Sequence, residues 1–254
     1  MMNGRRMATA SGAILADAAL LADASLLDAA GGSSSPEPLF EPQFWAGRGG
    51  ISPAGGGRGA AWFIDHGPEQ WVLRHYRRGG FVARLSEDGY LWTGEARVRA
   101  FAEYRLLADL AARGMPVPEP VAARYQRRGP WYRCDLITRR IPGAASLSGV
   151  LAAAPLADAS WSLVGATIAR LHIAGVDHAD LNAHNILLDG RGAVSVVDFD
   201  RSRVRRPGAW AARNLRRLHR SLAKISAALP EDRFSEEAWH RVLTGYAERS
   251  AAGE

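Results

Sequence analysis

The segment HADLNAHNILLD, at residues 178–189, crowds histidine, asparagine and aspartate beside a short apolar run. Asp180 and Asn185 lie five residues apart in it, and Asp198 comes thirteen residues after Asn185, at the end of the apolar segment VSVVD. An amide and a carboxylate that converge from a loop and an adjacent strand suit a magnesium ion that bridges phosphates. Asp180 is then left to accept the proton of a hydroxyl group. We therefore expect a phosphate-transfer site, with Asn185 and Asp198 as metal ligands and Asp180 as catalytic base.

A turn rich in Asp and Asn is the alternative explanation of this segment. It accounts for Asn182 and Asp189, which are residue types that suit turns. It does not account for the spacing of the other polar residues. His178 is expected to support the loop through hydrogen bonds to neighbouring backbone, and His184 has no assigned role.

Length and charge limit the classes of protein to consider. The 254 residues suffice for one large domain or a two-lobed unit. The net charge of +6 favours an anionic partner, such as a nucleotide, a phosphosugar, a lipid headgroup or a nucleic acid. The one cysteine, Cys134, cannot form an internal disulfide, which fits a reducing compartment. The longest uncharged run, residues 141–157, is shorter than the roughly 20 apolar residues of a spanning helix. We expect a cytoplasmic protein that visits a membrane surface.

The order of local signals predicts a mostly β half followed by a mostly α half. Residues 1–38 are rich in Ala, Gly and Ser, and we expect a flexible extension there, with a short helix over 14–27. Bulky residues separated by glycine turns predict strands within 49–80. Apolar residues at three- and four-residue steps predict a helix over 95–113, which Gly114 ends.

Two further strands are expected over residues 120–126 and 131–141, after which Pro142 and Gly143 mark a change to helical sequence. The expected fold class is α+β. An antiparallel β lobe with one main helix would occupy residues 39–141, and a mostly α lobe would occupy 142–254.

The spacing of the polar residues resembles the protein-kinase catalytic signature, H-R-D-L-x-x-x-N followed by D-F-G. Here the two parts read HADLNAHN and DFD. The resemblance implies a two-lobed protein-kinase-like fold that binds ATP and Mg²⁺. It also implies nucleotide contacts from the following residues: Gly55, Gly56, Gly57, Arg58 and Gly59 in a phosphate-covering loop, Arg74 with its partner Glu103 at the phosphates, and backbone from Thr138 to Ile141 at the adenine.

Two departures separate this chain from protein kinases. The strand cation is Arg74 and not a lysine, and arginine pairs with phosphate and carboxylate in a two-pronged geometry. Asp200 replaces the glycine of D-F-G, and no Ala-Pro-Glu triplet follows. A mobile activation segment and a peptide-binding apparatus are therefore not expected.

The sequence from about Gly12 to Lys224 resembles that of a narrower family, the bacterial Kdo (3-deoxy-D-manno-octulosonic acid) kinases of lipopolysaccharide core assembly. The resemblance is carried by seven runs: LFEPQFW (39–45), GRGAAWF (57–63), WVLRHYRRGG (71–80), MPVPEPVAA (115–123), DLNAHNILLD (180–189), VDFDR (197–201) and NLRRLHRSLAK (214–224). The family implies that ATP phosphorylates a Kdo hydroxyl on a Kdo–lipid A precursor. It also implies a peripheral location at the cytoplasmic face of the bacterial inner membrane.

The charge pattern points to an anionic acceptor and an anionic membrane surface. Nine Lys or Arg and no Asp or Glu lie between Arg201 and Pro230. Cationic contacts to phosphate and carboxylate are strong, and each basic side chain near an anionic leaflet adds attraction. We expect substrate contacts from the following residues: Arg77, Arg78, Asn182, Arg201, Arg213 and Arg217. The alternative for the helical arginines is the solvated face of an ordinary amphipathic helix.

Three other functions stay open at the level of sequence. A core heptose kinase or another small-molecule kinase would use the same scaffold. A pseudokinase would only bind nucleotide or hold partners together, which the joint presence of Asp180, Asn185 and Asp198 argues against. The high pI also suggests a nucleic-acid binder, but the chain has no RNP, zinc-finger or basic-zipper pattern, and we expect no nucleic-acid partner.

Overall fold

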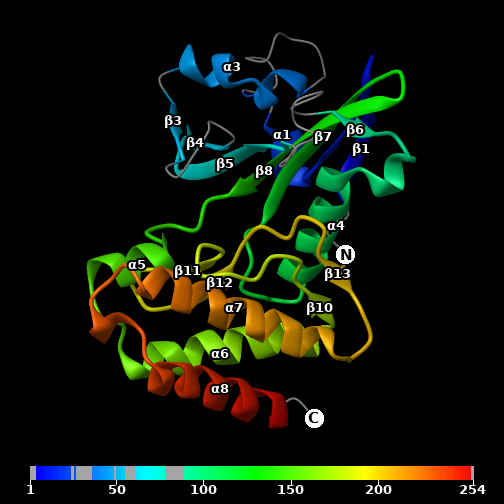
Figure 1. Cartoon of the computed structure of the whole chain (residues 1–254). Coiled ribbons are helices and arrows are strands. Elements are labelled where there is room, and N and C mark those ends of the chain that lie inside the picture. Colours follow the sequence, from blue (N-terminus) through cyan, green and yellow to red (C-terminus); the bar gives the residue numbers. More distant parts are fainter. Residues whose placement is uncertain are drawn as a thin grey trace. The chain divides into compact units, whose positions relative to one another are not determined.

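The structure is a computed structural model and describes residues 4–23, 26, 36–48, 50–54, 61–77 and 89–252. The chain divides into two compact units (Figure 1). The first contains Met1–Ala112 and Pro118–Arg140, and the second contains Arg113–Val117 and Ile141–Glu254. The predicted glycine loop, Gly55 to Gly59, and Arg78 lie outside the described residues.

The first unit is built on one antiparallel sheet in the strand order β1-β2-β7-β8-β5-β4-β3, with β6 also paired to β8. Its strands are β1 (Arg5–Ala8), β2 (Gly12–Ala16), β3 (Ile51–Pro53), β4 (Ala61–His66), β5 (Glu69–His75), β6 (Tyr90–Leu91), β7 (Pro120–Arg128) and β8 (Trp131–Arg139). The two longest strands, β7 and β8, form a hairpin at the centre of the sheet. Gly129 turns this hairpin with a φ of 59°, which glycine adopts without strain.

One face of the sheet is covered by the helix α4 (Arg99–Ala112), which follows the short 3-10 turn η3 (Glu95–Arg97). Its buried residues Phe101, Tyr104 and Leu107 recur at three-residue steps, as the sequence predicts for a helix with one apolar face. The helix ends before Gly114, whose φ is 66°.

The opposite face is covered by the N-terminal elements α1 (Ala18–Ala22), η1 (Glu37–Phe40) and α3 (Pro42–Ala46). Leu39, Phe40 and Trp45 pack there with Trp71 and Leu73 of β5 in one apolar cluster. The sheet is therefore buried on both sides in its central part.

A buried ion network fixes this N-terminal layer to the sheet. Arg124 of β7 donates from Nε to Asp135 of β8 at 2.9 Å and from Nη1 to Glu41 at 2.6 Å. His75 contacts the other oxygen of Asp135 at 2.6 Å. Since Arg124 and Asp135 are both buried, each offsets the cost of burying the other's charge.

The start of the chain differs from the expectation of a flexible extension to residue 38 with a helix over 14–27. Residues 5–16 form β1 and β2, and β2 pairs with the outer edge of β7. Among the described residues of 14–27, Ala18–Ala22 and Leu26 are helical. Four consecutive buried residues, Ala13 to Ala16, fit a strand that is covered on both faces, whereas a surface helix would bury only one side. The edge of β7 supplies the backbone partners that the local sequence does not reveal.

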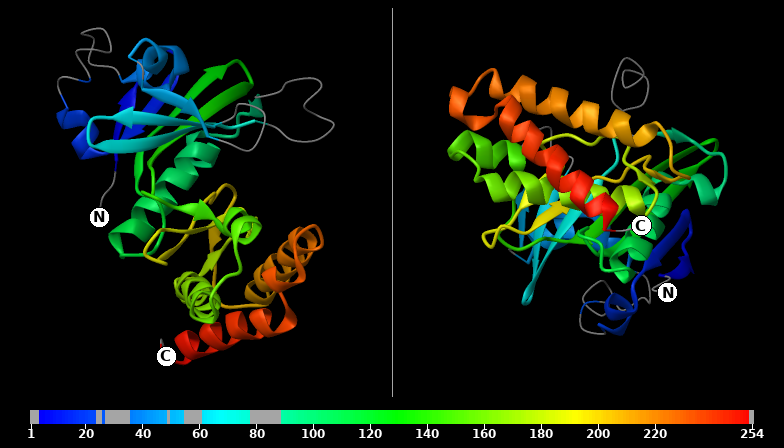
Figure 2. Two further views of the ribbon diagram at one scale, coloured as in Figure 1. Left: turned by 90° about the vertical axis from the view of Figure 1, so that its left-hand side faces the viewer. Right: turned by 90° about the horizontal axis from the view of Figure 1, so that it is seen from below.

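The second unit is mostly helical, with α5 (Leu147–Ala153), α6 (Asp158–Ile173), α7 (Trp210–Ser226), η4 (Glu231–Arg233) and α8 (Glu236–Ala251). Figure 2 shows α6 and α8 side by side. Gly165 of α6 lies against the Val242 carbonyl, and Gly245 of α8 lies against the Ser162 carbonyl. A side chain at either glycine would collide with the backbone of the other helix, so the pair sets this close approach.

No helix in the described part of the chain is long and apolar enough to cross a bilayer.

Candidate active site

Two short ladders in the second unit bring the predicted catalytic segments together. At one end, β10 (Val176–Asp177) pairs with β13 (Arg203–Val204), and at the other end β11 (Ile186–Leu188) pairs with β12 (Val194–Val196). The loop 178–185 and the turn 197–202 lie between the ladders and run antiparallel to each other. Because β10 pairs with β13 and β11 pairs with β12, the loop with Asp180 and the turn with Asp198 are neighbours.

His178 joins the two segments from inside. It is buried, it accepts the Asp180 N–H at Nδ1 over 3.2 Å, and its Nε2 lies 3.1 Å from the Val197 carbonyl. Since Nδ1 accepts a backbone proton, Nε2 carries the ring proton and donates it to Val197. Burial lowers the pKa of His178, while its bond to Val197 and the nearby charges of Asp198 and Asp180 oppose the change. The neutral ring therefore acts as a support, which confirms the expectation from sequence.

The loop itself is closed by its two asparagines. Asn185 donates from its amide nitrogen to the Asp180 carbonyl at 2.9 Å, and the Asn185 carbonyl accepts the Val197 N–H at 2.9 Å. These bonds place Asn185 beside both aspartate-bearing segments and use its amide nitrogen, not the oxygen that a cation takes.

Asn182 forms hydrogen bonds within the loop. Its Oδ1 accepts the N–H groups of His184 and Asn185 at 2.8 and 3.2 Å, and its nitrogen donates to the Asp180 carbonyl at 3.1 Å. All three bonds stay within the loop. Asn182 thus forms the turn, and its substrate contact stays a prediction.

The helix α7 supports the loop with a row of polar side chains. Of these, the sequence indicated Arg217 alone, as a substrate contact. Asn214 accepts the His178 N–H at 3.0 Å, Arg217 donates to the His178 carbonyl at 3.3 Å, and Ser221 accepts the Ala183 N–H at 3.2 Å. Their spacing of three and four residues puts them on one side of the helix. Asn214 also donates to Asp177 at 3.0 Å, so it ties the loop to β10.

We expect Asn214→Ala to lower kcat by roughly 10- to 100-fold with a smaller change in the KM for ATP, because the loop loses its anchor and a small misplacement of the catalytic groups is costly. The loss of the hydrogen bonds to half-buried Asp177 and buried His178 should also reduce the free energy of unfolding by about 1–3 kcal/mol. Steady-state kinetics and urea unfolding measure the two effects. Arg216→Ala, at an exposed position of the same helix, serves as control. Equal kcat in both variants would contradict the positioning role.

The turn that carries Asp198 has an unusual backbone. Asp198 has a φ of 64° and Arg201 a φ of 60°, and both are left-handed conformations that non-glycine residues rarely adopt. Phe199 between them is buried and meets the His178 ring edge-on at 4.9 Å. Such strain persists only where the surroundings enforce it, and it gathers at functional sites.

The first unit contains the predicted pair of Arg74 and Glu103. Arg74 of β5 donates to Glu103 of α4 at 2.5 Å. Tyr76 completes the group, since its hydroxyl donates to the same Glu103 oxygen at 2.5 Å and accepts from Arg74 at 2.9 Å. Glu103 is buried, whereas Arg74 is half-buried. Tyr76 is not among the residues predicted from sequence, although a bulky residue two positions after Arg74 lies on the same face of an extended strand.

The adenine contacts of Thr138 and Ile141 stay a prediction. Thr138 lies within β8 and pairs with Val72 on one side and Pro120 on the other, so the strand ladders use its backbone. Ile141 lies beyond the strand and begins the segment Ile141–Glu254 of the second unit. Of these two residues, Ile141 is therefore the one whose backbone lies outside β8.

The predicted substrate arginines lie mostly at the surface. Arg77, Arg201 and Arg213 are exposed, and Arg201 has a long contact of 4.0 Å to Asp200. Arg217 instead serves the loop, as described above.

The comparisons with known proteins address the same region. Residues 42–246 match the family described as "Lipopolysaccharide kinase (Kdo/WaaP) family". The chain belongs to this family.

Curated relatives carry a specific name. A protein named 3-deoxy-D-manno-octulosonic acid kinase, from Stenotrophomonas maltophilia (strain K279a), is 51% identical over 74% of this chain and 75% of its own length. A protein of the same name from Xanthomonas euvesicatoria pv. vesicatoria (strain 85-10) is 50% identical over the same shares. The predicted resemblance to Kdo kinases is confirmed.

A solved member of the Kdo/WaaP family supports the fold. The structure titled "WaaP in complex with acyl carrier protein" matches with a TM-score of 0.52 and 18% identity, over 82% of this chain and 87% of that one. At this identity the likeness concerns the fold alone. The predicted α+β, protein-kinase-like class is confirmed, with an antiparallel sheet in the first unit and helices in the second.

Proposed function

We propose that this chain transfers a phosphate group from ATP to a hydroxyl of a Kdo sugar on a Kdo–lipid A precursor, during assembly of the lipopolysaccharide core. The observation that supports the proposal is that His178 and the β11–β12 ladder join the loop with Asp180 and Asn185 to the turn with Asp198. Kdo is proposed as the acceptor sugar because the chain belongs to the lipopolysaccharide kinase family and because relatives at about 50% identity are named Kdo kinases.

Asp180 is the catalytic base. Its side chain is exposed, while its backbone N–H and carbonyl are fixed by His178 and Asn185. A carboxylate held in this way orients the sugar hydroxyl and takes its proton as the phosphate moves.

Asn185 and Asp198 are the residues that would hold Mg²⁺. Among the described residues, no group of three or more His, Cys, Asp or Glu has the geometry of a metal site. Two protein oxygens alone fit an ion that takes its other ligands from phosphates and water, as Mg²⁺ does. Mg²⁺, when bound, supplies positive charge to the phosphates.

In the first unit, Arg74 binds the α- and β-phosphates. Glu103 and Tyr76 fix its guanidinium, so little side-chain freedom is lost when phosphate binds. Ile141 contacts the adenine, and Gly55 to Gly59 cover the phosphates. Arg77, Arg78, Arg201 and Arg213 contact the anionic acceptor, and the protein works at the cytoplasmic face of the inner membrane.

The test is a phosphate-transfer assay with purified protein, ATP and Mg²⁺ on three acceptors: a Kdo–lipid A precursor, a heptosylated core and an aminoglycoside. Mass spectrometry of the product locates the phosphate. We expect one phosphate on Kdo of the first acceptor and none on the aminoglycoside. Phosphate on heptose alone would replace the proposal by a core heptose kinase, and the absence of any transfer would leave a nucleotide-binding pseudokinase.

A further inference from the structure

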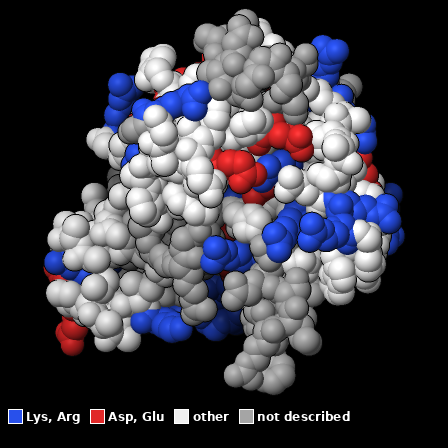
Figure 3. Space-filling model, turned by 90° about the horizontal axis from the view of Figure 1, so that it is seen from above, with Lys and Arg blue, Asp and Glu red and all other residues white. Residues whose placement is uncertain are grey.

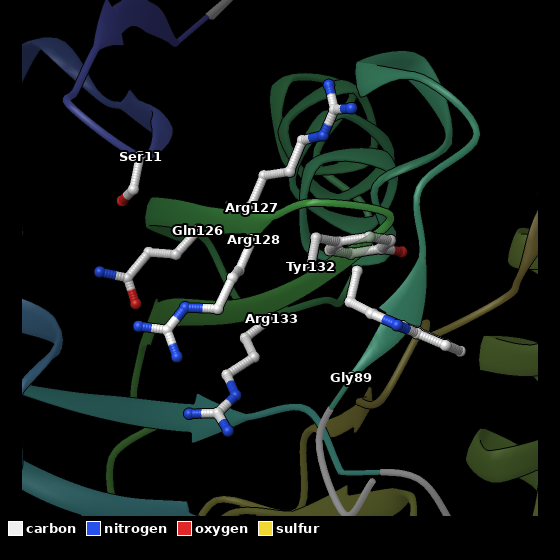
Figure 4. Close-up of a pocket in the computed structure, with 8 residues that line it drawn as sticks. Ser11, Gly89, Gln126, Arg127, Arg128, Tyr132 and Arg133 are labelled. Atoms are coloured by element: carbon white, nitrogen blue, oxygen red, sulfur yellow. The ribbon is translucent and has the colours of Figure 1, made fainter.

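Positive charge alone does not mark where an anionic acceptor binds on this chain. Figure 3 shows Lys and Arg atoms in several separate places on one face, with Asp and Glu atoms among them. At the tip of the β7–β8 hairpin, the lining of a pocket of about 510 Å³ includes Arg127, Arg128 and Arg133 (Figure 4). A group that selects the acceptor has to be tied to Asp180, because the sugar hydroxyl must meet that carboxylate.

The side chain of His184 is held by α5 and does not help to close the loop 178–185. Ser148, in the first turn of α5, has its Oγ 2.8 Å from His184 Nδ1. The Ser148 N–H also donates to the Ala183 carbonyl at 3.1 Å, so two bonds join this turn to the loop. The imidazole is therefore anchored on its Nδ1 side.

A chain of hydroxyl groups decides which ring nitrogen of neutral His184 carries the proton. Ser146 Oγ accepts the Gly149 N–H at 3.1 Å and lies 2.9 Å from Ser148 Oγ. When Ser146 donates to Ser148 and Ser148 donates to Nδ1, each hydroxyl proton has an acceptor. The reverse order would leave the Ser146 proton without an acceptor among these groups. The ring therefore carries its proton on Nε2, which is a donor.

This donor lies on the solvent side of the loop, as does the catalytic base. Asp180 and His184 are exposed, whereas Leu181 and Ala183 between them are buried. The Asn182 side chain bonds both backbones, since it donates to the Asp180 carbonyl at 3.1 Å and accepts the His184 N–H at 2.8 Å. Asp180 and His184 thus lie within the span of one asparagine side chain, which two oxygens of a single sugar can match.

The other polar side chains of the loop turn inward. His178 is buried and bonds backbone through both ring nitrogens. The nitrogens of Asn182 and Asn185 both donate to the Asp180 carbonyl. Within this loop, the Nε2–H of His184 is therefore the outward-facing donor for an acceptor held at Asp180.

We propose that His184 selects the acceptor by donating from Nε2 to the Kdo carboxylate while Asp180 holds the sugar hydroxyl. Kdo is an acid, and a carboxylate accepts a hydrogen bond more strongly than a neutral oxygen does. This assignment rests on the proposed function, which supplies the sugar. It gives the loop two separate tasks, since Asp180 takes the proton and His184 distinguishes the sugar acid from neutral sugars.

The test compares two soluble acceptors, a deacylated Kdo acceptor and its carboxyl-reduced form, in which a primary alcohol replaces the carboxylate. The native protein should prefer the acid by roughly 10-fold or more in kcat/KM, the scale of one hydrogen bond to a charged group. His184→Ala should lose most of this preference, mainly through a higher KM for the acid. The KM for ATP and the thermal unfolding midpoint should not change, because the side chain is exposed. His240→Ala, at an exposed position of α8, is the matched control and should keep the preference.

Two further substitutions of His184 separate a substrate contact from a structural role. In His184→Gln the amide nitrogen can take the place of Nε2, whereas in His184→Asn it can take the place of Nδ1 and keep the bond to Ser148. We expect part of the preference for the acid to return in His184→Gln but not in His184→Asn. Its return in His184→Asn alone would make His184 a structural residue and overturn the proposal.

Two other results would count against the proposal, namely equal kcat/KM of the native protein for both acceptors and a preference that survives in His184→Ala. Titration calorimetry of the two acceptors without ATP involves no turnover. Tighter binding of the acid, lost in His184→Ala, is expected, and equal binding or no binding would overturn the role of His184. The proposed function fails separately, when the acid binds but receives no phosphate.

Discussion

Asp180→Asn is expected to lower kcat by roughly a thousandfold, the scale of general base catalysis, and to leave the fold unchanged. Asparagine has the shape of aspartate but cannot take a proton from the sugar hydroxyl. The loop keeps its form because its bonds involve the Asp180 backbone, which donates to His178 and accepts from Asn182 and Asn185. Turnover of the Kdo acceptor measures the loss, and the thermal unfolding midpoint should stay within a degree or so of the native value because the side chain is exposed.

The matched control is Asp189→Asn. Asp189 belongs to the same motif, but its Oδ1 accepts the N–H groups of Arg191 and Ala193 in a turn, which asparagine reproduces. We expect normal kcat in this variant. Near-normal turnover in Asp180→Asn would remove Asp180 from the role of base and leave the site without one.

Asp198→Asn is expected to raise the Mg²⁺ concentration needed for half-maximal activity and to lower kcat by roughly 100-fold or more, since a charged ligand to the ion is lost. Asparagine is the right substitution because Asp198 has a φ of 64°, and asparagine tolerates this conformation better than other side chains. Initial rates over a Mg²⁺ titration at fixed ATP measure the effect.

Asp198→Ala separates ligation from backbone strain. Both variants lose the carboxylate, but alanine should also reduce the free energy of unfolding by about 1 kcal/mol, because it adopts a left-handed backbone less readily. Urea unfolding then distinguishes them while their Mg²⁺ dependence is similar. An unchanged Mg²⁺ requirement in Asp198→Asn would be incompatible with Asp198 as a metal ligand.

Both expectations depend on a loop whose backbone is held from several directions. The N–H groups of His178, Ala179, Asp180 and Ala183 bond to Asn214, Ser202, the His178 ring and Ser221. A loop with its donors satisfied in this way needs little reorganisation when substrate binds, which is the main source of catalysis in phosphate transfer. Since Asn214 and Ser221 belong to α7, this basic helix supports the loop in addition to exposing arginines to solvent.

The sequence by itself determined the features that depend on the order and spacing of residues along the chain. The spacing of Asp180, Asn185 and Asp198 predicted one loop and one strand end, and the structure brings these segments together. The resemblance to protein kinases predicted an ion pair of Arg74 and Glu103, and it is present. The change of character near residue 141 likewise follows from proline, glycine and periodicity alone.

Only the tertiary structure decided which distant groups support these parts. Asn214 and Ser221 contact the loop from more than 35 residues away, Tyr76 joins a pair formed between β5 and α4, and β2 pairs with the edge of β7 over 100 residues further on. Local propensity indicates helix or strand. A distant hydrogen-bond partner depends on which donors and strand edges remain unsatisfied once the chain has folded. For the same reason Asn182 closes its own loop, and the backbone of Thr138 belongs to the sheet.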